Sequence, residues 1–216
     1  MYYVSSVNIY INMKSYHHGN LKQELIDCAC RLCERDGYTK LSIRTLAKES
    51  GVSQTAPYRH FETKEALYAS VATDGFKKLH KACYIDINEK VTKKHLVKKG
   101  CKYIEFGIKN ANTYDLMFGT AVTDFSNYPE LLESANSTYE NMKSAFTKLA
   151  NEDDEAIAFK CITLWSMIHG LVGILRKVQL VGDNYDQDIG PISTATLIAN
   201  NLEDHLDKVV SGIVEN

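Results

Sequence analysis

The hydrophobic and polar positions over residues 42–61 predict two short helices joined by a tight turn. Ile43, Leu46 and Ala47 fall at i, i+3 and i+4, so they share one apolar face of the first helix. Gly51 follows this helix, where a residue without a side chain enters a left-handed turn at no steric cost. The pattern therefore predicts a helix that packs one face against a core and is followed by a sharp turn.

The second of these helices is expected to begin at Ser53, whose side chain can cap it. Pro57 falls within the first four residues, whose N–H groups have no partner inside a helix, so a proline is tolerated there. The side chains that remain exposed can donate hydrogen bonds to phosphates or base edges, His60 depending on its tautomer. They are Gln54, Thr55, Tyr58, Arg59 and His60. This pattern is typical of a helix-turn-helix, although purely structural helix pairs share the spacing.

Helical periodicity also dominates the rest of the chain, and the whole chain contains only three prolines. The predicted fold class is all-α, with an N-terminal three-helix helix-turn-helix DNA-binding domain followed by a helical ligand-binding and dimerisation domain. Thr113 is expected to cap a short helix over 114–119. Further helices are predicted over 20–36, 64–83, 93–111, 129–150, 155–181 and 191–213, with a polar loop at 183–190.

Charge is distributed unevenly, although the whole chain carries a net charge of only −2. Residues 1–102 hold 18 Lys and Arg against 10 Asp and Glu, whereas residues 103–216 hold 7 against 17. A basic end suits a protein that presents that end to nucleic acid, although chance unevenness on solvated helices gives the same split. We divide the chain into a tail (1–13), expected to be disordered or an upstream translation artefact, a DNA-binding domain (14–82) and a C-terminal domain (83–216).

Three cysteines, Cys28, Cys30 and Cys33, lie within one predicted amphipathic helix. At about 100° per residue, Cys28 points roughly 140–160° away from the other two, so the three thiolates do not form a tetrahedral metal site. We expect small buried side chains there and predict neither a metal nor a cofactor. A regulator switched by oxidation of one of these cysteines is an alternative.

A wider stretch, residues 16–69, resembles the DNA-binding domain of TetR/AcrR-type transcriptional regulators. The resemblance is carried by GYTKL at 37–41, LAKESGVS at 46–53 and YRHFETKEAL at 58–67. It implies that Lys64 reaches a DNA phosphate. The expected backbone contacts are Ser42, Arg44, Tyr58, His60 and Lys64, and the expected contacts to base edges or nearby phosphates are Gln54, Thr55 and Tyr58, with Arg59 on the same face.

The C-terminal half carries a second resemblance, to the WHG subgroup of TetR-type C-terminal domains. Its marks are TYDLMFG at 113–119 and LWSMIHGLVGI at 164–174, and the Trp, His and Gly of the name are here Trp165, His169 and Gly170. Trp165 and His169 share one face of a helix that is apolar nearly all round, which indicates burial in the core or between protomers. His169 is then either a core residue or a ligand contact. The candidate effector pocket comprises Tyr103, Phe106, Met117, Phe118, Trp165 and His169.

The resemblance implies a homodimeric regulator, a repressor that leaves a pseudo-palindromic operator when it binds a small, mostly apolar effector. The effector must bind one spacing of the two DNA-binding domains more tightly than the other. The longest uncharged stretch of the C-terminal helices, residues 161–175, is shorter than the roughly 20 residues that span a bilayer. We therefore expect a cytoplasmic protein without a membrane partner. A cytosolic enzyme is a remote alternative, because no nucleophile–base pair is visible.

Overall fold

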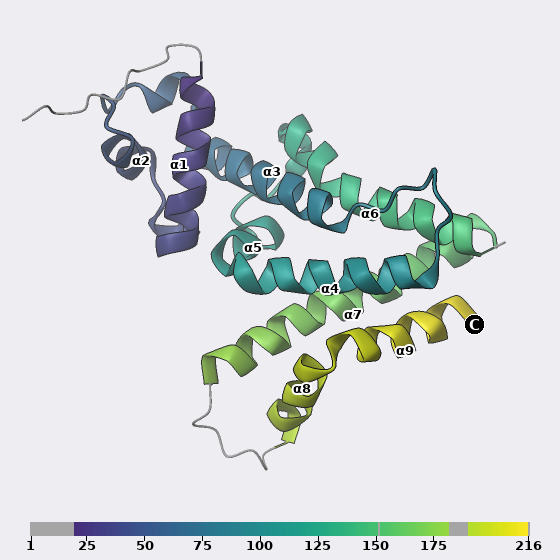
Figure 1. Cartoon of the computed structure of the whole chain (residues 1–216). Coiled ribbons are helices and arrows are strands. Elements are labelled where there is room, and N and C mark those ends of the chain that lie inside the picture. Colours follow the sequence, from purple (N-terminus) through teal and green to yellow (C-terminus); the bar gives the residue numbers. More distant parts are fainter. Residues whose placement is uncertain (1–19, 151, 182–189, 216) are drawn as a thin grey trace, which may run out of the picture.

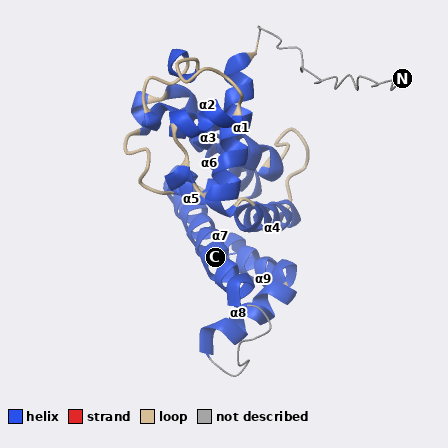
Figure 2. Ribbon diagram, turned by 90° about the vertical axis from the view of Figure 1, so that its left-hand side faces the viewer, coloured by secondary structure: helices blue, strands red, loops and turns tan. Residues whose placement is uncertain are grey.

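The computed structural model describes residues 20–150, 152–181 and 190–215. Every regular element within these ranges is a helix (Figure 2), which confirms the predicted all-α fold. The predicted tail, residues 1–13, and the predicted loop apart from Gly190 lie outside the described residues.

The N-terminal helices form a head, which we define as α1, α2, the turns η1 and η2 and the start of α3 (Figure 1). The elements are α1 (Leu21–Asp36), the 3-10 turn η1 (Tyr38–Lys40), α2 (Ile43–Glu49), the 3-10 turn η2 (Pro57–Arg59) and α3 (Lys64–Cys83). Leu25 of α1, Leu46 of α2 and Phe61 after η2 are almost completely buried. These side chains belong to one apolar core.

Local signals explain where the helices of the head begin and end. The Ser42 hydroxyl accepts a hydrogen bond from the Thr45 backbone N–H (3.1 Å), and the Ser42 N–H donates to the Thr45 hydroxyl (2.9 Å). Two N–H groups at the start of α2 are thereby satisfied. Gly51 has a φ of +68°, which confirms the predicted left-handed turn. Thr63 caps α3 by accepting the Ala66 N–H at 3.0 Å.

The second predicted helix of the motif is wrong in detail, because the chain there forms turns around η2 instead of an α-helix. Pro57 has no N–H to donate to the carbonyl of Ser53, four residues earlier. The backbone forms hydrogen bonds between residues three apart instead, the first from the Ala56 N–H to the Ser53 carbonyl at 3.0 Å. The Ser53 hydroxyl lies 3.2 Å from the Thr55 hydroxyl, and the helix cap predicted at Ser53 is not formed.

The remaining helices form a bundle, which we define as α4 to α9 with the rest of α3. They are α4 (Lys93–Lys109), α5 (Ala111–Phe118), α6 (Pro129–Leu149), α7 (Asp154–Val181), α8 (Gly190–Asn200) and α9 (Leu202–Glu215), with a 3-10 turn η3 (Phe125–Asn127) before α6. Helix α3 leaves the head and packs against α4, α5 and α6 (Figure 1). A Cβ at Gly75 of α3 would come within 2.6 Å of Met117 Sδ on α5, so these two helices approach too closely for any larger residue without a shift.

Two predicted helices of the bundle differ in the structure. Helix α5 begins at Ala111, before the predicted cap Thr113, whose hydroxyl instead donates to the Glu34 carboxylate on α1 at 2.8 Å. The single helix predicted over 191–213 is divided into α8 and α9 at Asn201. The Asn201 backbone N–H donates to the carbonyl three residues earlier (3.1 Å), and its side-chain amide donates to the carbonyl four residues earlier (3.0 Å). These local bonds compete with the regular helical ladder.

Helix α7 is long and apolar enough to span a membrane by length and composition alone, over Asp154–Leu180. The uncharged stretch 161–175 underestimates the apolar length of this helix. The few charged residues near its two ends leave the mean hydropathy of the helix high. In the bundle, 39% of the most apolar stretch is buried. Leu164 and Val172 face the core, whereas Phe159 and Ile174 are exposed. The helix is thus partly core and partly uncovered apolar surface.

Candidate nucleic-acid interface and effector cavity

The side chains predicted to contact DNA lie on α2, around η2 and at the start of α3, three neighbouring parts of the head (Figure 1). Tyr58 is 56% exposed, although it is a large aromatic residue. The Ser42 hydroxyl already accepts a bond within the cap of α2, and this residue is half-buried. The exposed members are Arg44, Gln54, Thr55, Tyr58, Arg59 and Lys64, and the half-buried ones are Ser42 and His60.

Lys64 is held at the start of α3 by contacts with η1. Its Nζ lies 3.5 Å from the Thr39 carbonyl oxygen and 5.1 Å from the centre of the Tyr68 ring. Tyr68 donates its hydroxyl to the Tyr38 carbonyl at 2.8 Å, which ties η1 to α3. A lysine beside the positive end of a helix dipole favours a phosphate. Lys40, exposed in η1, adds a further positive charge that sequence reasoning did not include.

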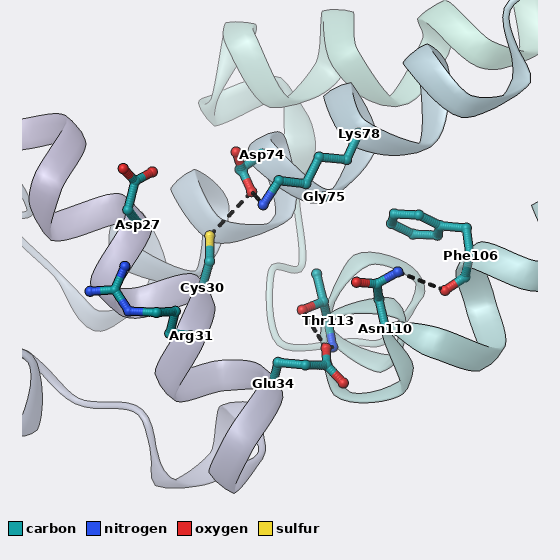
Figure 3. Close-up of a pocket in the computed structure, with 10 residues that line it drawn as sticks. All are labelled: Asp27, Cys30, Arg31, Glu34, Asp74, Gly75, Lys78, Phe106, Asn110 and Thr113. Atoms are coloured by element: carbon teal, nitrogen blue, oxygen red, sulfur yellow. Dashed lines mark hydrogen bonds and ion pairs between the residues drawn. The ribbon is translucent and has the colours of Figure 1, made fainter.

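A polar cavity of about 380 Å³ lies where α1 and α3 meet α4 and α5 (Figure 3). The Glu34 carboxylate on α1 accepts the backbone N–H groups of Asn112 (3.3 Å) and Thr113 (3.1 Å), in addition to the Thr113 hydroxyl. The Asn112 side chain donates back to the Glu34 carbonyl at 2.8 Å. A carboxylate is favoured at the start of a helix, so these bonds connect the head to α5. We call this group, Glu34, Asn112 and Thr113, the junction.

An apolar cavity of about 490 Å³ lies inside the bundle, between α3, α4, α5, α6 and α7. Its size is typical of a site for a small organic ligand. Four of the predicted pocket residues line it: Tyr103, Met117, Phe118 and Trp165. The structure does not bring the other two to this cavity. Phe106 lines the polar cavity near the junction, and His169 lines a third cavity of about 270 Å³ beside Arg176.

His169 is hydrogen-bonded to two tyrosines at the wall of the apolar cavity. Its Nδ1 lies 2.6 Å from Tyr114 Oη and 3.3 Å from Tyr103 Oη, and its tautomer decides which atoms donate. The Tyr114 hydroxyl and the Trp165 indole N–H both donate to Tyr103 Oη, each at 3.1 Å. Burial lowers the pKa of His169 and raises the pKa of Tyr103 to about 12. These groups are therefore uncharged at neutral pH.

Two family models match this chain. The head matches the model described as bacterial regulatory proteins, tetR family, over residues 25–71. The bundle matches the model described as tetracyclin repressor-like, C-terminal domain, over residues 96–192. The chain belongs to the TetR family. It is thus a helix-turn-helix, DNA-binding transcriptional regulator and not an enzyme, which confirms the resemblance of residues 16–69 to TetR-type regulators.

The chain is also similar to a curated regulator and to solved structures. Over 97 residues the chain is 23% identical to a Bacillus subtilis (strain 168) protein described as the uncharacterized HTH-type transcriptional regulator YobS. That match covers 45% of this chain, and the chain spans about half (51%) of the length of this curated relative. A protein with unknown function from Rhodococcus sp. RHA1 is 22% identical, with a TM-score of 0.68 over 90% of this chain and 97% of its own. A TetR variant from Acinetobacter baumannii AYE, solved in complex with minocycline, is 20% identical, with a TM-score of 0.60 over 88% and 91%. At these identities the solved structures show a shared fold.

Much of the cavity wall of this TetR-type chain comes from residues that sequence reasoning missed. Phe76 and Leu79 come from α3, and Thr138, Tyr139 and Met142 come from α6. The three residues of α6 follow helical spacing, which was the available signal for a shared face. The spacing does not show whether that face meets a core or a cavity, because the answer depends on helices that are distant in sequence.

Proposed function

We propose that this TetR-type regulator is a homodimeric repressor that a small effector, bound in the apolar cavity, releases from a pseudo-palindromic operator. Residues 14–82 are then the DNA-binding domain, and residues 83–216 are a WHG-type ligand-binding and dimerisation domain of a cytoplasmic protein. One observation carries the proposal: α3 holds Lys64 at its start and contributes Phe76 and Leu79 to the cavity wall. A ligand that moves this wall acts on the helix that carries the DNA contact.

The proposed DNA face comprises exposed side chains of the head together with the half-buried Ser42 and His60. Gln54, Thr55 and Tyr58 meet base edges or nearby phosphates, since amide and hydroxyl groups serve both kinds of contact. The remaining side chains hold the DNA backbone through charge and hydrogen bonds. They are Ser42, Arg44, Arg59, His60 and Lys64.

Two contacts support a route from the cavity to the head. Met117 lines the cavity, and its Sδ occupies the space beside Gly75 on α3, so a ligand that displaces Met117 pushes on α3. The other end of α5 is bonded to Glu34 on α1 through the junction. Because α5 contacts α1 and α3, a shift of α5 changes where the head lies relative to the bundle. An effector that binds the shifted state more tightly releases the operator.

The proposed dimer forms through the uncovered faces of α7 and α8. Phe159 is 63% exposed and Leu180 is 86% exposed on α7, and Leu197 is 65% exposed on α8. A Cβ added at Gly170 or Gly173 meets nothing within 4 Å, so a partner helix has room to approach the backbone there. Burying such apolar groups against a second copy contributes about 25 cal/mol per Å². Two copies of α7 and α8 would then form a four-helix interface around a two-fold axis.

A regulator switched by cysteine oxidation has less support. Burial raises the pKa of Cys33 to about 11. Burial and the Asp74 carboxylate, which accepts the Cys30 thiol at 3.3 Å, also raise the pKa of Cys30. The thiolate is the form that reacts with peroxide, so thiols that stay protonated react slowly. The effector mechanism is therefore the function that we propose.

The test begins by selecting fragments that the protein binds from random DNA and footprinting the best of them. A dimer that protects two half-sites separated by about one helical turn, or by a multiple of it, supports the proposal. A screen of small apolar compounds then finds those that release the DNA. Ala135→Phe, which adds a ring at the cavity wall, should keep operator binding and lose release. A monomer on a single half-site, or unchanged release from Ala135→Phe, would contradict the proposal.

A further inference from the structure

The walls of the apolar cavity indicate which chemical class of effector they would bind. The Phe76 and Phe118 rings lie 5.2 Å apart at 78°, and the Phe118 and Trp165 rings lie 6.4 Å apart at 47°. Rings at such angles present both faces and edges to an occupant. Met117 and Met142 add flexible, polarizable side chains that adapt to its outline. The cavity therefore suits a rigid, ring-containing molecule.

An ionised ligand finds no partner there, because none of the described residues lining the apolar cavity carries a formal charge. A carboxylate or an ammonium group would lose its water without gaining an opposite charge, which is costly. Arg176, a nearby cation, lines the separate cavity beside His169 and is paired with Asp115 at 2.6 and 2.9 Å. The cavity thus supplies no counter-ion for an anion or for a cation.

Thr138 on α6 supplies a buried polar group to the cavity. Its Oγ1 is fully buried and makes no hydrogen bond within the described part of the chain. Other hydroxyls of α6 donate to carbonyls of the preceding turn, as Thr147 does to Lys143 at 3.0 Å. The carbonyl that Thr138 would use belongs to Ser134 and already accepts the Ser137 hydroxyl at 2.7 Å. Thr138 lines both the apolar cavity and an adjoining cavity of about 40 Å³, so its side chain lies at their shared wall. Rotation about its Cα–Cβ bond would turn the covered hydroxyl toward a ligand.

Building on the proposed function, we propose that the effector is a neutral molecule with an aromatic or alicyclic ring system and one hydroxyl or carbonyl group that hydrogen-bonds to Thr138. A buried hydroxyl without a partner is costly, so a ligand that satisfies it gains affinity over a hydrocarbon of the same shape. Thr138 is then the residue that determines specificity for the polar group of the ligand.

The experiment uses four probes with one skeleton: cyclohexylbenzene, 4-cyclohexylphenol, 4-cyclohexylbenzoate and 4-cyclohexylphenyl-trimethylammonium. Trp165 is the single tryptophan of the chain and lines the cavity, so its fluorescence reports occupancy. Titrations on the full chain without DNA measure binding alone. We expect the phenol to bind most tightly, about 5- to 10-fold better than the hydrocarbon, and both ions to bind at least 10-fold more weakly than the phenol.

Two variants locate the hydrogen bond. Thr138→Val keeps the side-chain shape and should remove the advantage of the phenol while leaving cyclohexylbenzene affinity unchanged or slightly higher. Thr147→Val is the matched control, because it removes an exposed hydroxyl of the same helix outside the cavity. It should bind all four probes like the unmodified protein, and melting temperatures of both variants verify folding.

Tightest binding by the anion or the cation would overturn the inference, as would an unchanged phenol preference in Thr138→Val. Quenching by none of the four probes would overturn it too. Operator release is measured separately, on the DNA complex. If the phenol binds as expected but leaves the operator complex intact, the proposed repressor mechanism fails while the ligand class stands.

Discussion

The head and the bundle keep their candidate functional side chains in opposite places. On the head they project into solvent, as Tyr58 and Lys64 do. In the bundle they lie inside, where Tyr103 and Met117 are buried at the wall of the cavity. A surface group can be removed without leaving a cavity or an unpaired buried partner, whereas an interior group cannot. Substitutions on the head should therefore change DNA binding alone, and substitutions in the bundle should couple stability to ligand response.

The largest effect on DNA binding is expected at the uncovered apolar face of α7. This face is an exception to the comparison, because it belongs to the bundle but is exposed. Phe159→Glu should leave the protomer folded, because the side chain is already 63% exposed. It should prevent dimer formation, because a carboxylate buried in an apolar interface costs several kcal/mol. A loss of about 3 kcal/mol corresponds to roughly 100-fold weaker operator binding. Sedimentation and gel-shift titration measure both effects.

Leu132→Glu is the matched control for this dimer test. Leu132 is also an exposed large apolar residue, but it lies on α6, outside the face formed by α7 and α8. It should keep the dimer and the operator affinity of the unmodified protein. If Phe159→Glu stays dimeric, or if the two substitutions reduce dimer formation and operator affinity equally, the dimer interface does not lie on α7 and α8.

The next effect concerns the junction, where the head and the bundle meet. Glu34→Ala removes the acceptor of two backbone N–H groups and of the Thr113 hydroxyl. We expect the free energy of unfolding to fall by about 1–3 kcal/mol and the effector response to weaken, while the DNA face stays intact. Urea unfolding and effector-induced operator release test this. Glu24→Ala, at an exposed position of the same helix, is the control, and an equal response in both variants would remove the junction from the mechanism.

A smaller effect is expected on the surface of the head. Lys64→Ala should weaken binding to operator and to random DNA by roughly 5- to 10-fold, and the slope of log affinity against log salt should fall by about one for each phosphate that is no longer neutralised. Its melting temperature should stay nearly unchanged, because Lys64 is exposed. Lys94→Ala removes the same charge from the bundle and should leave DNA binding unaltered. Equal salt slopes for Lys64→Ala and the unmodified protein would show that Lys64 does not bind a phosphate.

The smallest effect is expected at His169, whose lowered pKa shows that the folded state disfavours its charged form. It therefore adds no pH dependence to folding well above its ordinary pKa of 6.5, and stability falls as the pH drops below that value. His169→Phe should lower stability at pH 8 by about 1 kcal/mol, because Tyr114 is left without this partner, and should flatten the decline toward pH 5.5. Urea unfolding at several pH values measures this. An unchanged pH profile would exclude a buried neutral histidine.

The sequence predicted most where structure is decided locally. The left-handed turn at Gly51 depends only on residues within one turn of the chain, and it is present. The second helix of the motif was predicted less well, because Pro57 has no backbone N–H to donate. The first N–H groups of any helix have no partner within it, so a proline there is compatible with an α-helix and with a 3-10 turn.

The cavity was predicted only in part because it depends on packing between distant helices. Trp165 and His169 share a helix face by spacing, yet only Trp165 lines the apolar cavity. His169 is hydrogen-bonded to Tyr114 on α5, and both residues line the separate cavity beside Arg176. Thr138 belongs to no sequence motif. It stands out only because the Ser134 carbonyl, which its hydroxyl would use, already accepts the Ser137 hydroxyl. Such features follow from three-dimensional neighbours, which helical periodicity does not specify.

If the cavity and the DNA face are coupled sites, effector and operator weaken each other's binding reciprocally. The affinity of 4-cyclohexylphenol is measured by Trp165 fluorescence on the free protein and on the protein saturated with operator duplex. Thermodynamic linkage requires operator to weaken phenol binding by the same factor by which phenol weakens operator binding, about 5- to 150-fold for typical coupled sites. The account predicts equal factors within that range. Identical phenol affinity for the free and the operator-bound protein would contradict it.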